Sequence, residues 1–368
     1  MAFPILESTQ IQVDANRLIC DLSMTVSGDL GSMVRAVIGV QPDSELPIKP
    51  PAGPIRWASS LLELCCNVYG QPVGRAVPVG ACLALLGIAS SALDAVQDGH
   101  GDLLTAYTTK PRSDPESETE SALLDGRERS LPLQCRIGNV APTDAYALAS
   151  NASTAVIGLA WQALLVHGPR YGIEDAMLLE IGQLLAERLV KICESQHRDL
   201  TLGRTPELNL EEYDQIIIGK TGQIDGTACE VGALLAGAPQ HRAFWQALGT
   251  ERAVAQQLYD DYRDFSDDLL NGRQIGHPVL YGLAVADGAQ RDNILALLNE
   301  IRSDSPQRHE AVERLTTLLR DLGAEYYTLT CMALHRNRAI AALNELQLPV
   351  EAHGWLYRWI MGVAPLVG

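Results

Sequence analysis

The stretch AVPVGACLALLGIASSALDAVQD, residues 76–98, decides which fold this chain can adopt. No charged residue interrupts it from Ala76 to Leu93, and its alanines and leucines recur at helical spacing. A helix that is apolar all round belongs at the centre of a large helical bundle. The stretch ends in acids, with Asp94 and Asp98 four residues apart and therefore on one face of a helix. We therefore expect a buried helix whose end presents carboxylates.

The rest of the chain predicts the same class of fold. Of its 368 residues 47% are hydrophobic and 20% charged, which is ordinary globular material with enough apolar surface for a large core. No strand-like alternation stands out, so we predict an all-α fold: a single large helical bundle. Two helices are expected between residues 55 and 98, separated near residues 70–72, and others over residues 143–167, 174–198, 210–237, 240–270, 278–300 and 306–345, followed by a terminal pair.

Two polar segments set the predicted organisation. Residues 1–54 read as an N-terminal segment that ends in a Pro-rich connector, and residues 55–368 as the helical domain. Within that domain residues 108–132 are rich in Pro, Ser and Glu, a composition that cannot bury a core. We predict that this stretch is a flexible polar insertion.

Charge and cysteine usage limit the classes of partner. A net charge of −17 argues against a general nucleic-acid binder, which needs a basic stripe. The run ending at Leu93 is long enough to span a membrane, but Pro78 and Gly80 interrupt it and no basic flank accompanies it. A second apolar run, residues 152–166, is shorter, and we interpret both as buried helices without a transmembrane segment. Eight scattered cysteines without metal-ligand spacing predict reduced thiols in a cytoplasmic protein.

A second acidic cluster follows another apolar approach. It lies in QQLYDDYRDFSDDLLNGR, residues 256–273, where Asp260 and Asp264 share a helical face and Asp261 lies beside them. One acidic run is most often a solvated surface, but two runs with the same spacing point to a shared task. Magnesium prefers carboxylate and phosphate oxygens, so two facing acid rows fit metal-mediated binding of a diphosphate. The apolar helix would then wall a cavity that shields a carbocation from water.

These motifs resemble those of the trans-isoprenyl diphosphate synthase (polyprenyl synthetase) family, whose class I isoprenoid synthase fold is an all-α bundle with a central apolar cavity. DAVQD, residues 94–98, resembles the family's first DDxxD motif with Ala95 in place of the second acid, and DDYRD, residues 260–264, matches the second motif fully. EEYDQIIIGKTG, residues 211–222, resembles the family's Lys-Thr helix, and ESQHRDL, residues 194–200, resembles its GQxxDL segment.

The resemblance implies roles for these residues. Three magnesium ions would be held, together with bound diphosphate, by the acids Asp94, Asp98, Asp260, Asp261 and Asp264, which with Lys220 form the predicted catalytic set. The diphosphate would also be contacted by Lys220, Thr221, Gln196, Gln257, Arg273, Arg56 and Arg127, with Asp199 beside Gln196. The prenyl chain would occupy a pocket beneath Asp94 lined by Ala89, Ser90, Leu86 and Cys82, whose small members suit chains of fifteen or twenty carbons or more. Small residues there would equally allow close helix packing.

The departures from the family concern its second substrate, isopentenyl diphosphate (IPP). The family's Gly-Lys-Arg segment aligns near PPAGPIRW, residues 50–57, where Arg56 alone remains, and Arg127 or Arg129 would replace its later arginines only after the long insertion. The resemblance thus implies a prenyltransferase that ionises an allylic prenyl diphosphate, C10–C20 or longer, for chain extension, and implies a homodimer. Three alternatives stay open: a terpene cyclase that needs no IPP, prenyl transfer to another acceptor, and a partner subunit of a heteromeric synthase.

Overall fold

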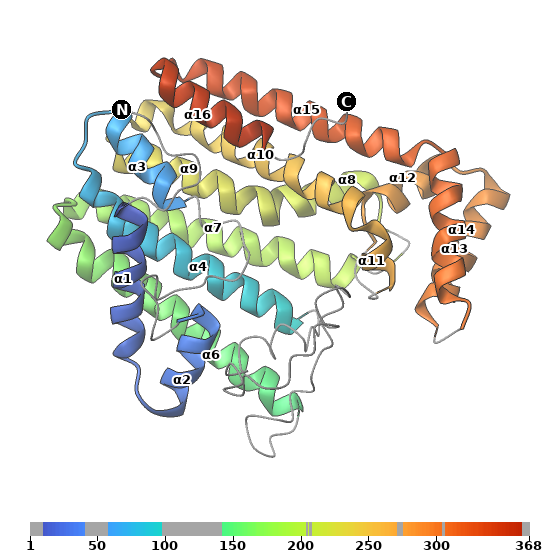
Figure 1. Ribbon diagram of the computed structural model, residues 1–368, viewed down its shortest axis with the longest axis horizontal. Coiled ribbons are helices and arrows are strands. Elements are labelled where there is room, and N and C mark those ends of the chain that lie inside the picture. The colour runs from blue at the N-terminus through green and yellow to red at the C-terminus, as the bar shows by residue number, and fades with distance from the viewer. Residues whose placement is uncertain are drawn as a thin grey trace, which may run out of the picture. The chain divides into compact units, whose positions relative to one another are not determined.

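The structure is a computed structural model that describes residues 10–40, 58–97, 142–203, 205, 208–270, 275–303 and 306–362, with the side chains of residues 142–145 left out. These residues are overwhelmingly helical, which confirms the predicted all-α class (Figure 1). The chain divides into two compact units, each described here by itself. We call them the N-terminal unit, Ser8–Ser60 with Gly74–Ile173, and the C-terminal unit, whose described residues lie in Leu61–Val73 and Glu174–Gly368.

The N-terminal unit is built around the apolar helix that the sequence predicted. Its helices are α1 (Gln10–Met24), α2 (Gly28–Ile38), α4 (Ala76–Gln97) and α6 (Pro142–Gln162), and α6 continues through a π-helical turn, η5 (Ala163–His167), into the 3-10 turn η6 (Gly168–Tyr171). Helix α4 packs against α6 and α1. Pro78 lies in the first turn of α4, where a helix needs no backbone donor.

Two helical stretches are long and apolar enough to cross a membrane by length and composition, Val73–Gln97 and Tyr146–Tyr171. In the first, 72% of the apolar window is buried, as expected for the centre of a bundle. In the second the buried share is 44%, and Leu165 and Val166 are about half exposed. The prediction of a helix buried all round therefore holds for α4, whereas the second stretch keeps an exposed apolar side.

The C-terminal unit is organised around α10 (Arg242–Arg263). Figure 1 shows α9 (Gln223–Leu235) and α15 (Ala324–Glu345) running beside α10, and both pack along its length. The other elements of this unit are most of α3 (Ala58–Val68), α7 (Asp175–Leu202), α8 (Leu210–Ile217), the π-helical turn η7 (Ile218–Gly222), α11 (Phe265–Leu270), α12 (His277–Val285), α13 (Gly288–Arg302), α14 (Arg308–Asp321) and α16 (Val350–Met361).

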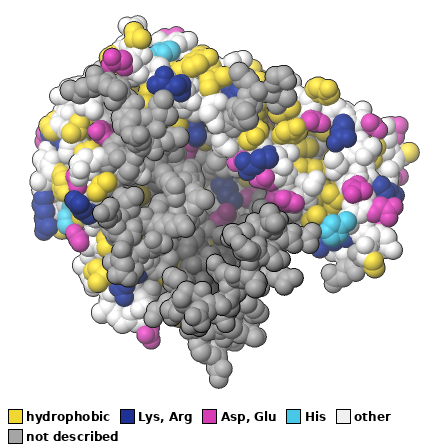
Figure 2. All heavy atoms as spheres, viewed as in Figure 1, with side chains coloured by type: hydrophobic (Ala, Val, Ile, Leu, Met, Phe, Trp, Pro, Cys, Tyr) yellow, Lys and Arg dark blue, Asp and Glu magenta, His cyan; other side chains and the backbone are white. Residues whose placement is uncertain are grey.

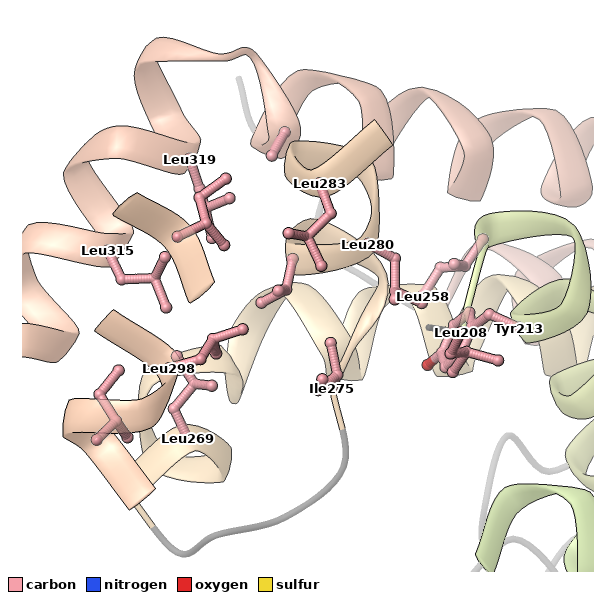
Figure 3. Packing of buried hydrophobic residues seen from close by; sticks show 14 of the residues in the cluster. Leu208, Tyr213, Leu258, Leu269, Ile275, Leu280, Leu283, Leu298, Leu315 and Leu319 are labelled. Carbon is pink, nitrogen blue, oxygen red and sulfur yellow. The ribbon is translucent and has the colours of Figure 1, made fainter. Parts of the chain in front are cut away.

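One apolar cluster ties α8 and α10 to the helices that follow them. Figure 3 shows Leu258 of α10 beside Leu280 of α12 and Tyr213 of α8 beside Leu208, while Leu315 and Leu319 extend the cluster onto α14. All of these side chains are buried, so they are removed from water at about 25 cal/mol per Å² of apolar area. This packing fixes the end of α10 that carries the second acidic cluster.

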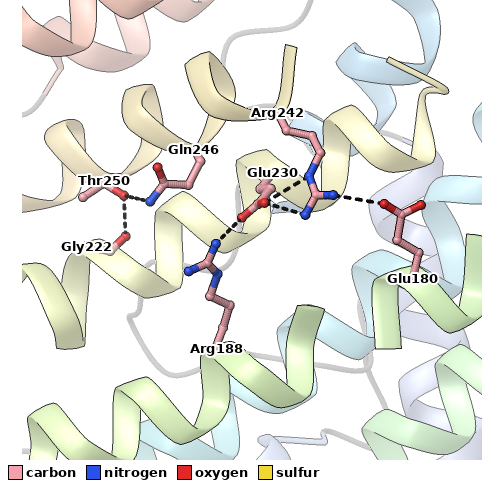
Figure 4. Close-up of polar contacts among 7 residues, drawn as sticks. All are labelled: Glu180, Arg188, Gly222, Glu230, Arg242, Gln246 and Thr250. Carbon is pink, nitrogen blue, oxygen red and sulfur yellow. Dashed lines mark hydrogen bonds and ion pairs between the residues drawn. The ribbon is translucent and has the colours of Figure 1, made fainter. Parts of the chain in front are cut away.

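A buried carboxylate joins α7, α9 and α10 at the other end of the unit. Glu230 on α9 accepts hydrogen bonds from Arg242 at 2.8 and 3.1 Å and from Arg188 at 3.0 Å, while Arg242 also reaches Glu180 (Figure 4). The Glu230 side chain is only 6% exposed, so its charge depends on these two arginines. The three helices are thus held in register by charge as well as by packing.

Three long predicted helices are interrupted. The stretch predicted as one helix over residues 240–270 breaks at Asp264, between α10 and α11. In the other two the sequence carries the reason for the break. The stretch predicted as one helix over residues 278–300 breaks at Asp287, whose side chain caps α13 in a reciprocal capping box with Gln290. The stretch predicted over residues 306–345 breaks at Gly323, whose φ of +84° is readily adopted by glycine. After α15, α16 is the single helix that the described residues form.

The described surface mixes charges of both signs. On the face in Figure 2, acidic and basic side chains are interspersed with hydrophobic ones. The described cysteines are free thiols, and Cys65, Cys66, Cys82 and Cys229 are buried.

Candidate active site

Lys220 and Thr221 lie on the π-helical turn η7, between α8 and α9. A π-helical turn widens the helix locally and is often found at functional sites. Gly219 makes this position possible, because a side chain there would collide with the Ser195 hydroxyl on α7. The sequence GKTG therefore brings the Lys-Thr pair close against α7.

The position of the Lys220 ammonium is fixed by a buried acid. Its Nζ donates to Oδ2 of Asp199 at 2.9 Å, and the Asp199 side chain is 6% exposed. Gln196 lies one helical turn before Asp199 on the same helix. Three of the residues that the resemblance singled out therefore lie at one place in the C-terminal unit.

Asp261 is the centre of a second set of contacts. Its Oδ1 accepts a hydrogen bond from Gln257 at 3.0 Å, and its Oδ2 accepts from the Tyr213 hydroxyl and from the backbone N–H of His277. Gln257 in turn accepts from the Thr221 hydroxyl at 3.2 Å. Burial raises the pKa of Asp261 to about 6, although the hydrogen bonds from Tyr213 and Gln257 act in the opposite direction.

His277 is held as a neutral ring behind this acid. Its Nδ1 lies 2.8 Å from the Thr328 hydroxyl, which itself donates to the carbonyl of Ala324. The Thr328 oxygen must therefore accept from the histidine, which assigns the proton to Nδ1. Burial lowers the pKa of His277 to about 4, so the ring is uncharged near neutral pH.

Asp260 and Asp264 are the more accessible acids of the second cluster. Their side chains are 35% and 38% exposed, and the guanidinium of Arg263 bridges them at 3.1 and 2.6 Å. Gln256 also donates to Asp260 at 3.1 Å, and burial raises the pKa of that carboxyl. These two acids therefore already hold a positive charge between them.

The first acidic cluster lies in the N-terminal unit, at the end of α4. Asp94 is partly buried and shares a helical face with Ser90 and Leu86, which are also partly buried. Ala95 is 3% exposed. Of the four predicted pocket residues, Cys82 and Ala89 are fully buried instead, and burial raises the pKa of the Cys82 thiol to about 12.

Several predicted residues lie outside the described part of the chain: Asp98, Arg56, Arg127 and Arg273. Within the described residues no group of three or more His, Cys, Asp or Glu side chains is arranged to hold a metal ion. The facing of the two acidic clusters, which belong to different units, stays a prediction.

Sequence reasoning assigned no role to two residues of this site, Tyr213 and His277. Tyr213 lies 48 positions before Asp261 and His277 lies 16 after it, so no periodicity connects them. The sequence offered one signal for Tyr213. This residue lies on α8, directly before the turn η7 that bears the Lys-Thr pair, and so belongs to the segment that resembles the family's Lys-Thr helix.

Comparison with known proteins agrees with the motifs. The family model of polyprenyl synthetases, described as "Polyprenyl synthetase", matches residues 144–315. The short chain isoprenyl diphosphate synthase of Methanothermobacter thermautotrophicus is 27% identical over 165 residues, which is 42% of this chain and 49% of that protein. This chain therefore matches about half the length of such curated relatives, which are named as isoprenyl diphosphate synthases and hence are prenyltransferases.

Solved structures show the same fold over nearly the whole chain. A polyprenyl synthetase from Streptomyces coelicolor superimposes with a TM-score of 0.74 at 16% identity, covering 97% of this chain and 98% of that one. A polyprenyl synthase from Caulobacter crescentus, solved with calcium and isoprenyl diphosphate, gives a TM-score of 0.68 at 18% identity, covering 97% and 98%. At these identities the likeness establishes the all-α isoprenoid synthase fold.

Proposed function

Because the chain is a divergent relative of the polyprenyl synthetase family, we propose that it is a prenyltransferase that ionises an allylic prenyl diphosphate. The observation that carries this proposal is the cluster in the C-terminal unit, where the Lys220–Asp199 pair, the Thr221–Gln257–Asp261 chain and the acids at the end of α10 lie on neighbouring elements. An ammonium, a hydroxyl and paired carboxylates are the groups that a metal-bound diphosphate requires.

The donor set fits a hard divalent cation such as Mg²⁺. Asp260 and Asp264 offer carboxylate oxygens four residues apart, and Arg263 already balances part of their charge. We propose that these two acids, with Asp94 and Asp98 of the first cluster, hold magnesium on the substrate diphosphate. Bound magnesium would neutralise the charge that develops on the leaving diphosphate.

The residues of this chain then have separate tasks. Lys220, held in place by Asp199, donates to phosphate oxygens, and Arg273 and Arg56 are proposed to add further cationic contacts. The allylic carbon–oxygen bond breaks as negative charge passes to the diphosphate. The face of α4 that carries Leu86 and Ser90 continues directly from Asp94, so we propose that it lines the chain pocket and keeps water from the cation. An acceptor double bond then attacks the cation, and loss of a proton completes the transfer.

Cyclisation is the second candidate, because PPAGPIRW, residues 50–57, lacks most of the basic residues that would hold IPP. An ionised chain whose own double bond attacks the cation needs no second diphosphate. One experiment separates the two reactions: purified protein and magnesium are incubated with C10, C15 and C20 allylic diphosphates, with and without IPP, and products are identified by mass spectrometry. Longer diphosphates formed only with IPP support chain extension, whereas hydrocarbons or alcohols formed without IPP support cyclisation.

Asp260→Ala provides the control for either reaction, because turnover by this variant at the wild-type rate would contradict a role for the second cluster. No turnover by the wild type with any of these substrates would contradict the proposed activity, and would favour another acceptor or a role as partner subunit.

We also propose that the protein is a cytoplasmic homodimer. The exposed apolar side chains Leu148, Leu165 and Val166 on α6 and η5 would be covered by a second copy. Light scattering after size-exclusion chromatography measures the mass directly, and a monomer at micromolar concentration would contradict the dimer.

A further inference from the structure

The hydroxyl of Tyr213 reaches the acidic cluster from a different element. Tyr213 belongs to α8, is buried, and donates its phenolic O–H to Oδ2 of Asp261 near the end of α10. Its ring lies 6.2 Å from that of His277, which is the first residue of α12 and donates its backbone N–H to the same oxygen. Asp261 therefore joins α8, α10 and α12 at one point.

Both oxygens of Asp261 are engaged by neutral donors. Tyr213 and the N–H of His277 donate to Oδ2, Gln257 donates to Oδ1, and Gln257 accepts from Thr221 on η7. Buried polar groups are normally satisfied in this way, and a partly satisfied buried carboxylate is strongly destabilised. Through Gln257 and Thr221, these hydrogen bonds also link α10 to η7, the turn that bears Lys220.

The two motifs agree on which positions point inward. In the second motif Asp261 is 8% exposed, whereas Asp260 and Asp264 are partly exposed. In the first motif the second position is Ala95, which is buried, and the first position, Asp94, is partly exposed. The second position of each motif lies about 100° around the helix from the first, so it turns into the packing rather than toward a ligand.

We propose that Tyr213 is a positioning residue for the metal-binding acids, acting through Asp261, and that Asp261 orients the end of α10 instead of binding metal directly. The inference rests on the proposed function and deepens it. Tyr213 and His277 hold Asp261, Asp261 fixes the rotation of the last turn of α10, and that rotation aims Asp260 and Asp264. Groups that hydrogen-bond to the ligands of a metal ion commonly affect metal affinity by ten- to a hundredfold.

The test measures metal binding without turnover. Purified protein is titrated with Mg²⁺ in the presence of inorganic diphosphate, and the metal concentration at half-saturation is read by calorimetry. We expect Tyr213→Phe, which removes one oxygen and keeps the packing of the ring, to raise that concentration about tenfold. The melting temperature of each variant is recorded, and binding is measured well below it.

Tyr262→Phe is the matched control. Tyr262 is the neighbour of Asp261 in sequence, and its hydroxyl donates to Glu325 at 2.8 Å instead of to the acid cluster. The same chemical change, made on the helix that carries Asp261, should leave the half-saturating metal concentration unchanged. An equal shift in both tyrosine variants would contradict a specific role for Tyr213.

A second pair of variants separates positioning from direct ligation. Asp261→Asn can still accept from Tyr213 and His277, and its amide can donate to Gln257 once that side chain flips, so metal binding should be weakened moderately. Asp260→Asn removes a proposed ligand and should weaken it far more. This pair also tests the inference if Tyr213→Phe fails to fold.

Three results would overturn the inference: wild-type metal binding in Tyr213→Phe, equal shifts in the two tyrosine variants, or a loss in Asp261→Asn as complete as in Asp260→Asn. In all three the wild type binds metal and diphosphate, so the proposed function stands. Failure of the wild type to bind them at all would instead remove the proposed function, and this inference with it.

Discussion

Arg263 places a guanidinium between the accessible acids of the second cluster. It contacts Asp260 and Asp264 and lies over the ring of Tyr259, with its carbon 5.6 Å from the ring centroid. A guanidinium in this position compensates the same carboxylates that a metal ion would use. Metal must therefore compete with an internal cation for Asp260 and Asp264.

Replacing that cation should make metal binding easier. We expect Arg263→Gln to lower the half-saturating Mg²⁺ concentration by about 1.4- to 5-fold, because the competing charge at a largely exposed site is screened and worth about 0.2–1 kcal/mol. The same calorimetric titration measures the shift. Arg314→Gln is the control, since Arg314 forms a surface pair with Glu300 far along the sequence from this cluster. Unchanged or weaker metal binding in Arg263→Gln would contradict the competition.

Single residues also show where sequence reasoning stops. The spacing of Asp260, Asp261 and Asp264 identified the cluster, and the Lys-Thr pair was identified by resemblance. The distinction between Asp261 and its neighbours depends on Tyr213, and that contact forms only when α8 folds onto α10. The sequence marked the segment that contains Tyr213, but not the contact of Tyr213 with Asp261.

At the scale of the element, the sequence predicted most helices, assigned no helix to the stretches that form α1 and α2, and missed three breaks and two π-helical turns. The capping box of Asp287 and Gln290 was readable, and its omission merged two helices. The turn η7 was not readable in the same way. Its wider geometry depends on Gly219 meeting Ser195 of α7, a contact between distant segments.

The ion pairs of Glu230 with Arg188 and Arg242 connect α7, α9 and α10, so removing this one buried charge should lower the stability of the protein strongly. Glu230→Gln should lower the free energy of unfolding by roughly 3 kcal/mol, because Arg188 and Arg242 would lose their shared buried counter-ion. Denaturant unfolding followed by circular dichroism measures the change. Glu180, the exposed partner of Arg242, has a side chain that is 50% exposed. Glu180→Gln should therefore change the free energy of unfolding by less than about 1 kcal/mol. Similar losses in both variants would show that burial does not set the effect.

We predict that the face of α4 that carries Asp94, Ser90 and Leu86 lines a pocket for the prenyl chain. Ser90→Phe should block that face one helical turn from Asp94. It should lower or abolish the rate with the longest prenyl substrates, without a comparable loss of rate with the shortest. Ser91→Phe is the control, because Ser91 is exposed and lies on another face of the same turn. Relative rates with C10, C15 and C20 allylic diphosphates give the comparison, and equal effects of both substitutions would argue against the pocket.

At the scale of the whole molecule, stability should depend on pH through buried acids. Burial raises the pKa of Asp225 to about 6, although its contact with Arg252 at 2.8 Å lowers it. The unfolded chain has a pKa near 3.8 at this residue, so between about pH 4 and 6 the folded state binds more protons than the unfolded state. Stability should therefore fall as pH rises through this range and level off above it.

Asp225→Asn isolates this contribution. A difference of about 2 pKa units corresponds to at most about 3 kcal/mol, so the unfolding free energy of the wild type should fall more steeply from pH 4.5 to 7 than that of the variant. Denaturant unfolding at several pH values measures both slopes. Parallel curves would mean that Asp225 titrates in the folded protein as it does in the unfolded chain.

The C-terminal helix has a part in the same ion pair. The guanidinium of Arg252 lies 4.3 Å from the ring centroid of Trp359 on α16 and donates a hydrogen bond to Asp225 on α9. The indole thus insulates a buried charge pair from solvent. A protease that cleaved the chain before Val350 would remove α16 and Trp359 and let water reach both charges. Cleavage at the surface would thus weaken an ion pair in the interior of the unit.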